Sequence, residues 1–268
     1  MNELNKRVVP IIGLTSNGVL KKYSNGILTG LTSEECLTEL IQNTTNNAII
    51  IKPQTGGGGA GITSVVLDGR HLVFSGQFTS FQDLLKKIGQ SSVDYIITEK
   101  IMQRGVFHKI NPNSLNTLRV LTMIDPVSME PFIAMAIQRF GVVKSGVVDN
   151  FTSGWISACV DVETGVIGQG ATYPEGEHVV WLNYHPDTNE HFDGIEIPMW
   201  NEIKKYVIQL AKQYHYIPYV GWDIVPNEDS FYVLEGNSNS DVNVFQIHRP
   251  LLRDKRIRDF YRFHKVIN

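Results

Sequence analysis

Apolar residues recur at helical spacing in three stretches of the chain. Two of these stretches follow the segments 32–35 and 79–82, in which a threonine and a serine precede glutamate or glutamine. This order is typical of a helix N-terminus, where a hydroxyl accepts a hydrogen bond from a backbone N–H. The third stretch follows Pro198, a residue that suits the first turn of a helix. The pattern predicts three helices, which include residues 36–41, 81–88 and 203–214.

Most other apolar residues form short runs that are typical of β-strands. Asp68–Gly69–Arg70 and Glu163–Thr164–Gly165 interrupt these runs with turn-forming residues and predict hairpins. Many strands combined with three separate helices favour an α+β fold over a repeated βαβ fold. The expected strands cover residues 48–52, 64–67, 71–74, 95–102, 115–124, 131–140, 155–162, 221–225 and 231–239.

The order of these elements indicates two α+β lobes. Residues 45–100 read as strand, glycine-rich loop, hairpin, helix and strand, and we expect them to form a small lobe. Residues 101–268 would form a larger lobe with a mostly antiparallel sheet. Residues 1–44 would then be a short N-terminal segment.

Composition and charge narrow the class of protein. Apolar residues make up 42% of the 268 positions and charged residues 19%, as in ordinary globular proteins. The net charge of −3 does not suggest binding to nucleic acid or to an anionic membrane. Cys36 and Cys159 have no metal-binding spacing, and no apolar run reaches the length of a membrane span or a signal core. We therefore expect a cytoplasmic protein with no nucleic-acid partner.

Three oxygen-bearing side chains lie at the edges of the last two apolar runs. Because residues 226–230 are turn-forming, the two runs are expected to pair as an antiparallel hairpin. Glu235 and Asn237 would share one face, with Asp223 beside them on the partner strand. Two carboxylates and an amide oxygen suit Mg²⁺, especially when phosphate supplies further ligands. The alternative is an acidic, solvated face of an edge strand.

A glycine-rich segment suggests a phosphate site. An apolar strand delivers Lys52, after which the glycines leave backbone N–H groups open to an anion. The segment is not a P-loop, because the lysine precedes the glycines, and it is not a dinucleotide-binding fingerprint. The alternative is a mobile surface loop. The glycines that we expect near phosphate are Gly56, Gly57, Gly58, Gly59 and Gly61.

Further polar groups are candidates for the rest of a nucleotide site. An adenine ring could lie against Glu99, Lys100, Ile101 and Met102, although periodicity alone shows only a buried strand with a charged end. Arg119 and Arg139 lie on two strands and could neutralise charge during phosphate chemistry. Each arginine alone is more commonly a structural ion-pair partner.

Loop residues in the second half of the chain are candidates for acceptor binding, because they are polar and adjoin Gly, Pro and Trp155. For His185 the alternative is a turn histidine that precedes a proline. The basic segment 248–258 is expected to be a solvated helix and not a nucleic-acid patch. The acceptor candidates are Asp149, Asn150, Thr152, Ser153 and His185.

Taken in order, these segments resemble the ATP-grasp superfamily, and most closely its sugar-transfer-associated branch. The resemblance extends from about residue 45 to residue 250. The segments that carry it are Ile51–Lys52–Pro53 with the glycine-rich loop, Glu99–Lys100–Ile101, Asn116–Thr117–Leu118–Arg119, Val148–Asp149–Asn150–Phe151–Thr152–Ser153–Gly154, His185–Pro186–Asp187–Thr188, Gly221–Trp222–Asp223 and Leu234–Glu235–Gly236–Asn237.

The resemblance implies an ATP- and Mg²⁺-dependent enzyme with ATP held between two lobes. Such enzymes transfer the γ-phosphoryl group to a carboxylate, and an amine then attacks the acylphosphate. Lys52 would contact the α- and β-phosphates, the glycine-rich loop the β- and γ-phosphates, and Glu99 to Met102 the adenine. Asp223, Glu235 and Asn237 would hold Mg²⁺. The acceptors would be small molecules or glycan precursors, and the oligomeric state is not predicted.

Two departures from the superfamily pattern leave alternatives open. Many ATP-grasp ligases have an arginine two residues before the first metal-binding aspartate, whereas this chain has Gly221, so Arg119 or Arg139 would supply that charge. The N-terminal segment is short, with Lys6 as the candidate for a further phosphate-contacting lysine. A kinase on the same fold and an inactive nucleotide-binding protein therefore remain alternatives to a ligase.

Overall fold

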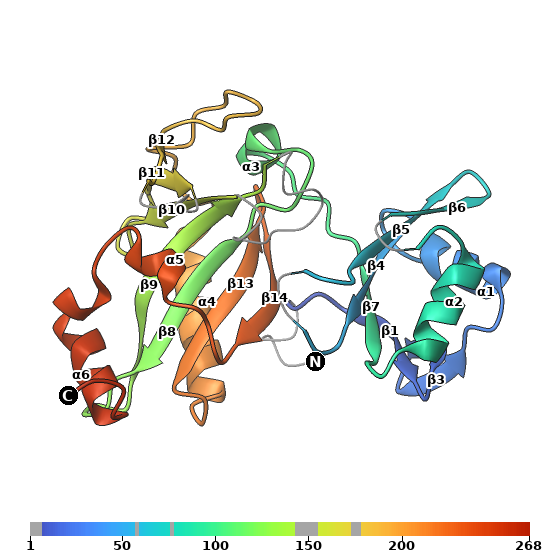
Figure 1. Ribbon diagram of the computed structural model, residues 1–268, viewed down its shortest axis with the longest axis horizontal. Coiled ribbons are helices and arrows are strands. Elements are labelled where there is room, and N and C mark those ends of the chain that lie inside the picture. The colour runs from blue at the N-terminus through green and yellow to red at the C-terminus, as the bar shows by residue number, and fades with distance from the viewer. Residues whose placement is uncertain (1–6, 57–58, 76–77, 143–154, 173–177) are drawn as a thin grey trace. The chain divides into compact units, whose positions relative to one another are not determined.

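The computed structural model describes residues 7–56, 59–75, 78–142, 155–172 and 178–268, which form two compact units (Figure 1). One unit is Val9–Met102. The other combines the start of the chain, up to Val8, with Gln103–Asn268. Each unit contains one seven-stranded sheet, and every pair of neighbouring strands is antiparallel.

The sheet of the smaller unit has the order β3-β2-β1-β7-β4-β5-β6. Apolar residues from alternate strand positions form one buried cluster with the apolar sides of its two helices. Both helices begin at a serine whose side chain accepts a backbone hydrogen bond, as the sequence pattern predicts. The elements are β1 (Ile11–Ser16), β2 (Val19–Ser24), β3 (Ile27–Gly30), α1 (Glu34–Gln42), β4 (Ala48–Pro53), β5 (Thr63–Asp68), β6 (His71–Phe74), α2 (Phe81–Gln90) and β7 (Tyr95–Glu99).

The N-terminal segment differs from the expectation of a separate, reduced region. Strands β1 to β3 extend the sheet of the smaller unit, because β1 pairs with β7. Two-residue loops, Asn17–Gly18 and Asn25–Gly26, connect these strands, and all four residues have positive φ. Such loops match the twist of a hairpin, and Asn-Gly is the sequence that favours them. The sequence therefore contained a hairpin signal here that the apolar pattern alone did not reveal.

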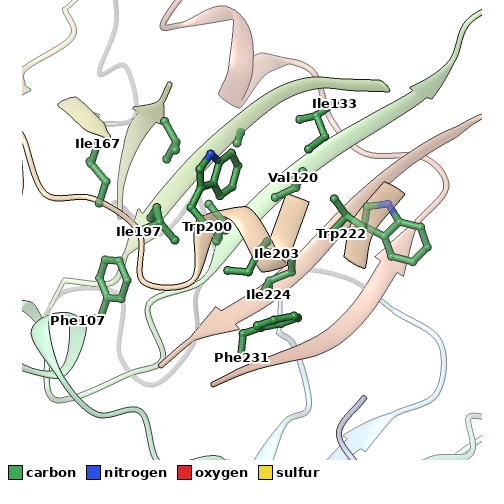
Figure 2. Close-up of a cluster of buried hydrophobic side chains, with 14 of the residues drawn as sticks. Phe107, Val120, Ile133, Ile167, Ile197, Trp200, Ile203, Trp222, Ile224 and Phe231 are labelled. Atoms are coloured by element: carbon green, nitrogen blue, oxygen red, sulfur yellow. The ribbon is translucent and has the colours of Figure 1, made fainter. Parts of the chain in front are cut away.

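The sheet of the larger unit has the order β12-β11-β10-β9-β8-β13-β14. Helix α4 (Trp200–Gln213) packs against β8 and β9 on one face, where Trp200 and Ile203 join a large apolar cluster (Figure 2). Helix α5 (Asn243–Gln246) contacts β9, and helix α6 (Lys255–Phe263) contacts β8. The buried apolar residues of both helices belong to another cluster. The strands are β8 (Leu118–Ile124), β9 (Pro131–Phe140), β10 (Ile156–Val160), β11 (Ile167–Thr172), β12 (Trp181–Leu182), β13 (Tyr219–Pro226) and β14 (Phe231–Asn237).

The helices of the larger unit only partly follow the sequence pattern. Helix α4 (Trp200–Gln213) begins after Met199, so Pro198 lies before the first turn and not within it. The basic segment continues into α6 (Lys255–Phe263), while α3 (Val106–Ile110) and α5 (Asn243–Gln246) are too short to show a clear period. Across the described residues, no helix is both long enough and apolar enough to span a membrane.

Candidate functional site

The hairpin of β13 and β14 brings the predicted oxygen-bearing residues together. Asp223 lies opposite Glu235, and Gly221 lies opposite Asn237. The strand register shifts between Asp223 and Ile224, which indicates a bulge directly beside this site. The antiparallel pairing that places Asp223 beside Glu235 is the one that the sequence predicted.

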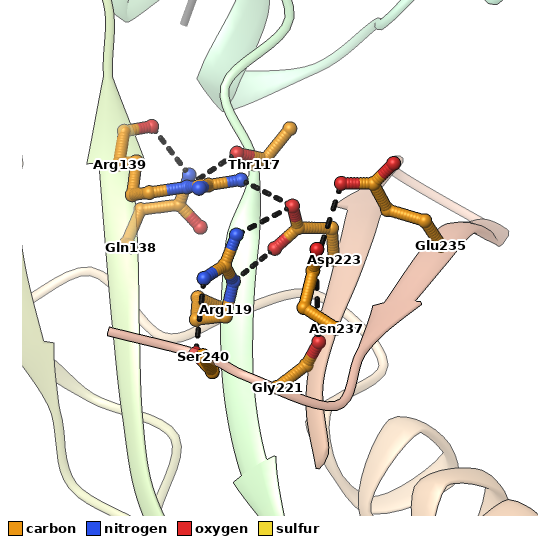
Figure 3. Close-up of polar contacts among 9 residues, drawn as sticks. All are labelled: Thr117, Arg119, Gln138, Arg139, Gly221, Asp223, Glu235, Asn237 and Ser240. Atoms are coloured by element: carbon orange, nitrogen blue, oxygen red, sulfur yellow. Dashed lines mark hydrogen bonds and ion pairs between the residues drawn. The ribbon is translucent and has the colours of Figure 1, made fainter. Parts of the chain in front are cut away.

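Asp223 is the centre of a buried charge cluster (Figure 3). Its exposed fraction is 5%, and both of its carboxylate oxygens face arginines. Arg119, which lies opposite Asp223 on β8, donates from Nε to Oδ1 and from Nη2 to Oδ2 at 2.8 Å. Arg139 on β9 places Nη2 3.1 Å from Oδ2. Two guanidinium groups therefore hold one carboxylate, one of them in bidentate geometry.

The arginines determine the ionisation of Asp223. Burial alone would raise the pKa of the carboxyl group, but the charge of Arg139 and the hydrogen bond and charge of Arg119 outweigh it. The pKa of Asp223 therefore lies below its ordinary value of 3.8. Asp223 is therefore ionised at neutral pH, beside the guanidinium groups of Arg119 and Arg139.

Each arginine has a second anchor. Arg119 donates from Nη1 to Ser240 Oγ at 3.1 Å, and Arg139 donates from Nε to Thr117 Oγ1 at 2.8 Å. The guanidinium carbon of Arg139 also lies 5.2 Å from the centre of the Trp155 ring. Ser240 was not predicted as a site residue, because it is 121 residues from its partner and matches no motif.

Gly221 creates the space that Arg119 occupies. A Cβ atom at this position would collide with Ser240 Oγ and would lie 2.7 Å from Ser240 Cβ and 3.0 Å from Arg119 Cδ. A side chain on β13 would therefore displace the arginine that β8 provides. The missing arginine two residues before Asp223 thus coincides with an arginine that reaches Asp223 from the neighbouring strand.

Glu235 and Asn237 lie in a more open environment than Asp223. Glu235 is exposed and Asn237 is partly buried, and the Asn237 Nδ2 atom donates to Glu235 Oε1 at 3.2 Å and to the Gly221 carbonyl at 3.4 Å. An accessible carboxylate beside an amide oxygen fits a partly hydrated Mg²⁺ ion. Within the described parts of the chain, no group of three or more His, Cys, Asp or Glu side chains is arranged for a metal ion. The cation site would therefore rest on few protein ligands.

The smaller unit holds the predicted phosphate-binding residues. Lys52 lies on β4 and alternates with Ile51, which belongs to the core, so Lys52 is on the sheet face that is turned away from α1 and α2. Gly56, Gly59 and Gly61 have positive φ, and a Cβ at Gly61 would lie 2.9 Å from Pro53 Cγ. This loop therefore requires glycine for its backbone path. Gly57 and Gly58 lie outside the described residues.

The expected adenine segment begins at Glu99, the last residue of β7, so the strand does not extend to Met102 as expected. The backbone N–H of Lys100 donates to the Ala48 carbonyl at 3.1 Å, and the Lys100 carbonyl accepts from Asn46 Nδ2 at 3.2 Å. Glu99 accepts a hydrogen bond from Thr45 at 3.5 Å. Ile101 is partly buried and Met102 is exposed. Because the backbone groups of Lys100 are already hydrogen-bonded, the backbone groups of Ile101 and Met102 would be the ones to bind an adenine.

Of the predicted acceptor residues, the structure describes only His185. Asp149, Asn150, Thr152 and Ser153 lie outside the described residues. The side chain of His185 is fully buried, its Nε2 atom lies 2.7 Å from the Gly141 carbonyl, and its Nδ1 atom accepts from the Asp187 N–H at 3.3 Å. Both ring nitrogens thus hold the loop, so this geometry fits a turn histidine and not an acceptor-binding group.

A second polar pair lies on the β10 side of the arginines. Ser157 on β10 lies opposite Arg139, and its hydroxyl is 3.0 Å from His248 Nε2. Burial lowers the pKa of His248 from 6.5 to about 4, so the imidazole is neutral at neutral pH. The indole of Trp181 meets this imidazole edge to face. Sequence reasoning missed the pair because its members are 91 residues apart.

The segment that enters the larger unit is fixed by buried amides. Gln103 donates from Nε2 to the carbonyls of Asn116 and Pro226 at 3.0 and 2.9 Å. Asn116 donates to Gln103 Oε1 and to the Phe107 and Asn111 carbonyls at 2.8–3.0 Å. Asn116 in the Asn-Thr-x-Arg segment is thus a structural residue that holds the chain at the start of β8, where Arg119 lies.

Residues 18–258 match the sequence family described as sugar-transfer associated ATP-grasp. This match covers well over half of the chain. The chain belongs to this family. Membership of the sugar-transfer associated ATP-grasp family agrees with the α+β fold of two antiparallel sheets, and it confirms the resemblance derived from the order of the motifs. A search of curated proteins found no match.

Solved structures similar to this ATP-grasp protein include several ligases. One is a RiPP-associated ATP-grasp ligase from Chryseobacterium gregarium in complex with ADP and a leader and core peptide, with 12% identity, a TM-score of 0.40, and 96% of this chain and 55% of that chain covered. Another is a macrocyclase from Microcystis aeruginosa bound to its precursor peptide, with 13% identity, a TM-score of 0.43, and 96% and 58% covered. D-alanine–D-alanine ligase from Bacillus anthracis has 13% identity, a TM-score of 0.39, and 81% and 56% covered. This chain thus spans little more than half the length of these proteins.

Proposed function

We propose that the protein is an ATP- and Mg²⁺-dependent ligase that activates a carboxylate as an acylphosphate for attack by an amine or a similar nucleophile. The observation that carries this proposal is the adjacency of two kinds of group on β8, β9, β13 and β14. The guanidinium groups of Arg119 and Arg139 contact the buried Asp223, and the exposed Glu235 and the partly buried Asn237 lie beside it. Phosphoryl transfer depends mainly on such positioned positive charge.

The proposed reaction has two steps, and each step forms one bond and breaks one bond. An oxygen of the acceptor carboxylate attacks the γ-phosphorus of ATP, and the bond from that phosphorus to the β–γ bridging oxygen breaks, which releases ADP. The amine nitrogen then attacks the carbonyl carbon of the acylphosphate. A C–N bond forms, the C–O bond to phosphate breaks, inorganic phosphate leaves, and the nitrogen loses a proton to water.

The residues of the chain have distinct roles in this proposal. Lys52 and the glycines at 56–61 bind the phosphates of ATP, and the backbone at Ile101 and Met102 binds adenine. Glu235 and Asn237 hold Mg²⁺, which neutralises phosphate charge as a Lewis acid when bound. Arg119 and Arg139 stabilise the negative charge of the transferring phosphoryl group. We propose small-molecule or glycan-precursor acceptors, which the family description favours.

The proposal can be tested before either natural acceptor is known. Hydroxylamine replaces the amine and traps an acylphosphate as a hydroxamate, so a panel of carboxylates can be screened with MgATP and hydroxylamine. The expected result is ADP, phosphate and a hydroxamate with at least one carboxylate. Glu235→Gln should abolish the signal, whereas Asp229→Asn, an equivalent change at an exposed position in the turn of the same hairpin, should retain it.

Two results would contradict a ligase of this type. Formation of AMP would show adenylation of the carboxylate and not phosphorylation. Release of ADP with a single acceptor, to give a phosphorylated product that is stable to hydroxylamine, would identify a kinase.

A further inference from the structure

We propose that His248 and Trp181 form the binding site for the carboxylate-bearing acceptor, with His248 Nδ1 donating a hydrogen bond to the acceptor carboxylate. Ser157 is the positioning residue that holds the imidazole. The inference rests on the proposed function and deepens it, because it assigns a place to the molecule whose carboxylate attacks ATP. It gives His248 the role that the sequence suggested for His185.

The first argument is the place of these residues on the sheet of the larger unit. Ser157 on β10 lies opposite Arg139 on β9, and on its other side it lies opposite Ala171 on β11. Ala171 in turn lies opposite Trp181 on β12. Side chains that are directly opposite on antiparallel strands share one face of a sheet. The row therefore continues, on one face, from the arginine that contacts Asp223.

This row lies on the side of Arg139 that the proposed reaction requires for the acceptor. In phosphoryl transfer the attacking and leaving oxygens lie roughly in line, on opposite sides of the phosphorus. Glu235, the proposed cation ligand on the nucleotide side, lies on β14, whereas β10 is on the other side of β9. Paired residues on neighbouring strands have Cα atoms about 5 Å apart. An acceptor beside Ser157 would thus be next to the group that Arg139 stabilises.

The second argument is the state of the imidazole. His248 is partly buried, its Nε2 atom is 3.0 Å from Ser157 Oγ, and its ring meets the Trp181 indole edge to face with centroids 5.6 Å apart. Ala171, which lies between these two partners on the sheet, has only a methyl group as its side chain, so the imidazole can contact both.

The hydrogen bond to Ser157 determines which ring nitrogen faces a bound molecule as a donor. Ser157 is fully buried, and among the described residues its hydroxyl has no partner other than His248 Nε2. Buried hydroxyl protons are hydrogen-bonded, so the Ser157 hydroxyl donates to Nε2. The proton of the neutral imidazole is then on Nδ1. In the part of the chain that the structure describes, Nδ1 has no hydrogen-bond partner, and it remains a donor for a ligand.

The same imidazole is poorly suited to remove a proton from the attacking amine. Burial lowers the pKa of His248 to about 4. A base this weak contributes little to proton transfer at neutral pH. The neutral ring can, however, donate a hydrogen bond to a carboxylate throughout the neutral range. The chemistry of His248 therefore favours binding of the acceptor over proton transfer.

Trp181 supplies an apolar wall beside this donor. Its exposed fraction is 47%, so much of the indole is accessible to a ligand. Small-molecule sites are lined mainly by apolar and aromatic side chains, with a few polar groups that fix the orientation of the ligand. An accessible indole in contact with an imidazole donor has this composition. The part of the acceptor next to its carboxylate would contact the indole.

The test separates acceptor binding from nucleotide binding and from a merely structural role of the imidazole. Hydroxamate formation is measured with MgATP, hydroxylamine and the carboxylate that is most active with the wild type. The amide group of glutamine at position 248 reaches the place of Nε2, whereas that of asparagine reaches the place of Nδ1. His248→Gln should therefore keep the contact with Ser157 and lose the contact with the acceptor, and His248→Asn should do the reverse.

We expect His248→Gln to raise KM for the carboxylate at least about tenfold, because a hydrogen bond to a charged group is lost. His248→Asn should remain within about threefold of the wild type, and both variants should keep KM for MgATP within about twofold. Trp181→Ala tests the same site at an exposed side chain and should raise KM for the carboxylate about fivefold through lost apolar contact. His215→Gln, at an exposed histidine, is the control and should change neither constant.

The possible failures are distinguishable. If His248→Gln matches the wild type while His248→Asn does not, the imidazole only holds Ser157, and this inference is wrong while the ligase proposal stands. The inference is also wrong if KM for MgATP rises as much as KM for the carboxylate. If circular dichroism shows that neither His248 variant folds, Trp181→Ala decides, and wild-type KM for the carboxylate in that variant overturns the inference. If no carboxylate gives a hydroxamate with the wild type, the proposed function itself is wrong.

Discussion

His248 is the residue whose protonation should have the clearest effect on stability. Burial lowers its pKa from 6.5 to about 4 in the folded protein. The unfolded chain therefore takes up a proton near pH 6.5 while the folded chain does so only near pH 4, and stability falls as the pH falls between these values. A shift of this size corresponds to a free energy on the order of 3 kcal/mol.

Urea unfolding at pH 7 and at pH 4.5 would measure this effect. Replacing His248 with glutamine should remove most of the difference between the two pH values, because the glutamine does not titrate. His215→Gln, at an exposed histidine, should leave the difference unchanged. An equal loss of stability in wild type and His248→Gln would show that His248 is not the group responsible.

At the residue scale, sequence reasoning found the ionic groups but not their partners. Asp223, Arg119 and Arg139 could be singled out because each interrupts an apolar run. Their mutual contacts could not be derived, because Arg119 and Asp223 are 104 residues apart and meet only through strand register. Sheet pairing also buries Asp223, whereas Glu235 on the next strand stays exposed. The sequence does not show this difference in burial, since both residues adjoin apolar residues of a strand.

At the scale of elements, the packing of β13 against β8 depends on Gly221. Gly221→Ala should push Arg119 and Ser240 apart, because the added Cβ would overlap Ser240 and crowd the Arg119 Cδ. We expect a loss of about 1–3 kcal/mol in unfolding free energy, as for other overpacked positions. Turnover should fall as well, because Arg119 would lose its position beside Asp223.

Gly168→Ala provides a matched control for this substitution. Gly168 lies on β11 of the same sheet, and an added Cβ would meet only the Cys159 carbonyl at 3.7 Å, an ordinary contact. This variant should keep both stability and turnover. If Gly221→Ala behaves like Gly168→Ala, then the close approach of Arg119 to β13 has no functional role.

Elements with local signals could be predicted, and elements defined by distant contacts could not. Helices α1 and α2 begin at serine caps, and the β13–β14 hairpin has a turn-forming loop, so each is determined within a few residues. Strand β12 has only two residues, Trp181–Leu182, and exists because β11 pairs with it. Nothing in two residues can specify a strand without its partner.

At the scale of the whole molecule, the smaller unit is an insertion into the larger one. The chain leaves the larger unit at Val8, after the Arg7 carbonyl accepts a hydrogen bond from the Val233 N–H at 2.7 Å. It returns at Gln103, which binds the Pro226 carbonyl. The two segments of the larger unit that flank residues 9–102 are thus hydrogen-bonded to β14 and β13 of that same unit. This arrangement was not predictable, because the apolar pattern does not show that residues 9–44 join the sheet of residues 45–100.

The segment at Gln103, where the chain returns to the larger unit, should be destabilised by a substitution at Asn116. Asn116→Ala would remove donors to Gln103 and to the Phe107 and Asn111 carbonyls, which are buried around it. We expect a loss of roughly 2 to 4 kcal/mol in unfolding free energy, because buried acceptors would lose their donor. Asn113→Ala, at an exposed asparagine three residues away, should cost little. Equal urea midpoints for the two variants would contradict a structural role for Asn116.

The most direct test of the central claim is a calorimetric titration of ATP with and without Mg²⁺ into the wild type, Glu235→Ala and Asp229→Ala. The account predicts that Mg²⁺ tightens ATP binding in the wild type and in Asp229→Ala, and that Glu235→Ala loses this dependence while remaining folded. Lack of MgATP binding by the wild type, or wild-type affinity for MgATP in Glu235→Ala, would contradict it.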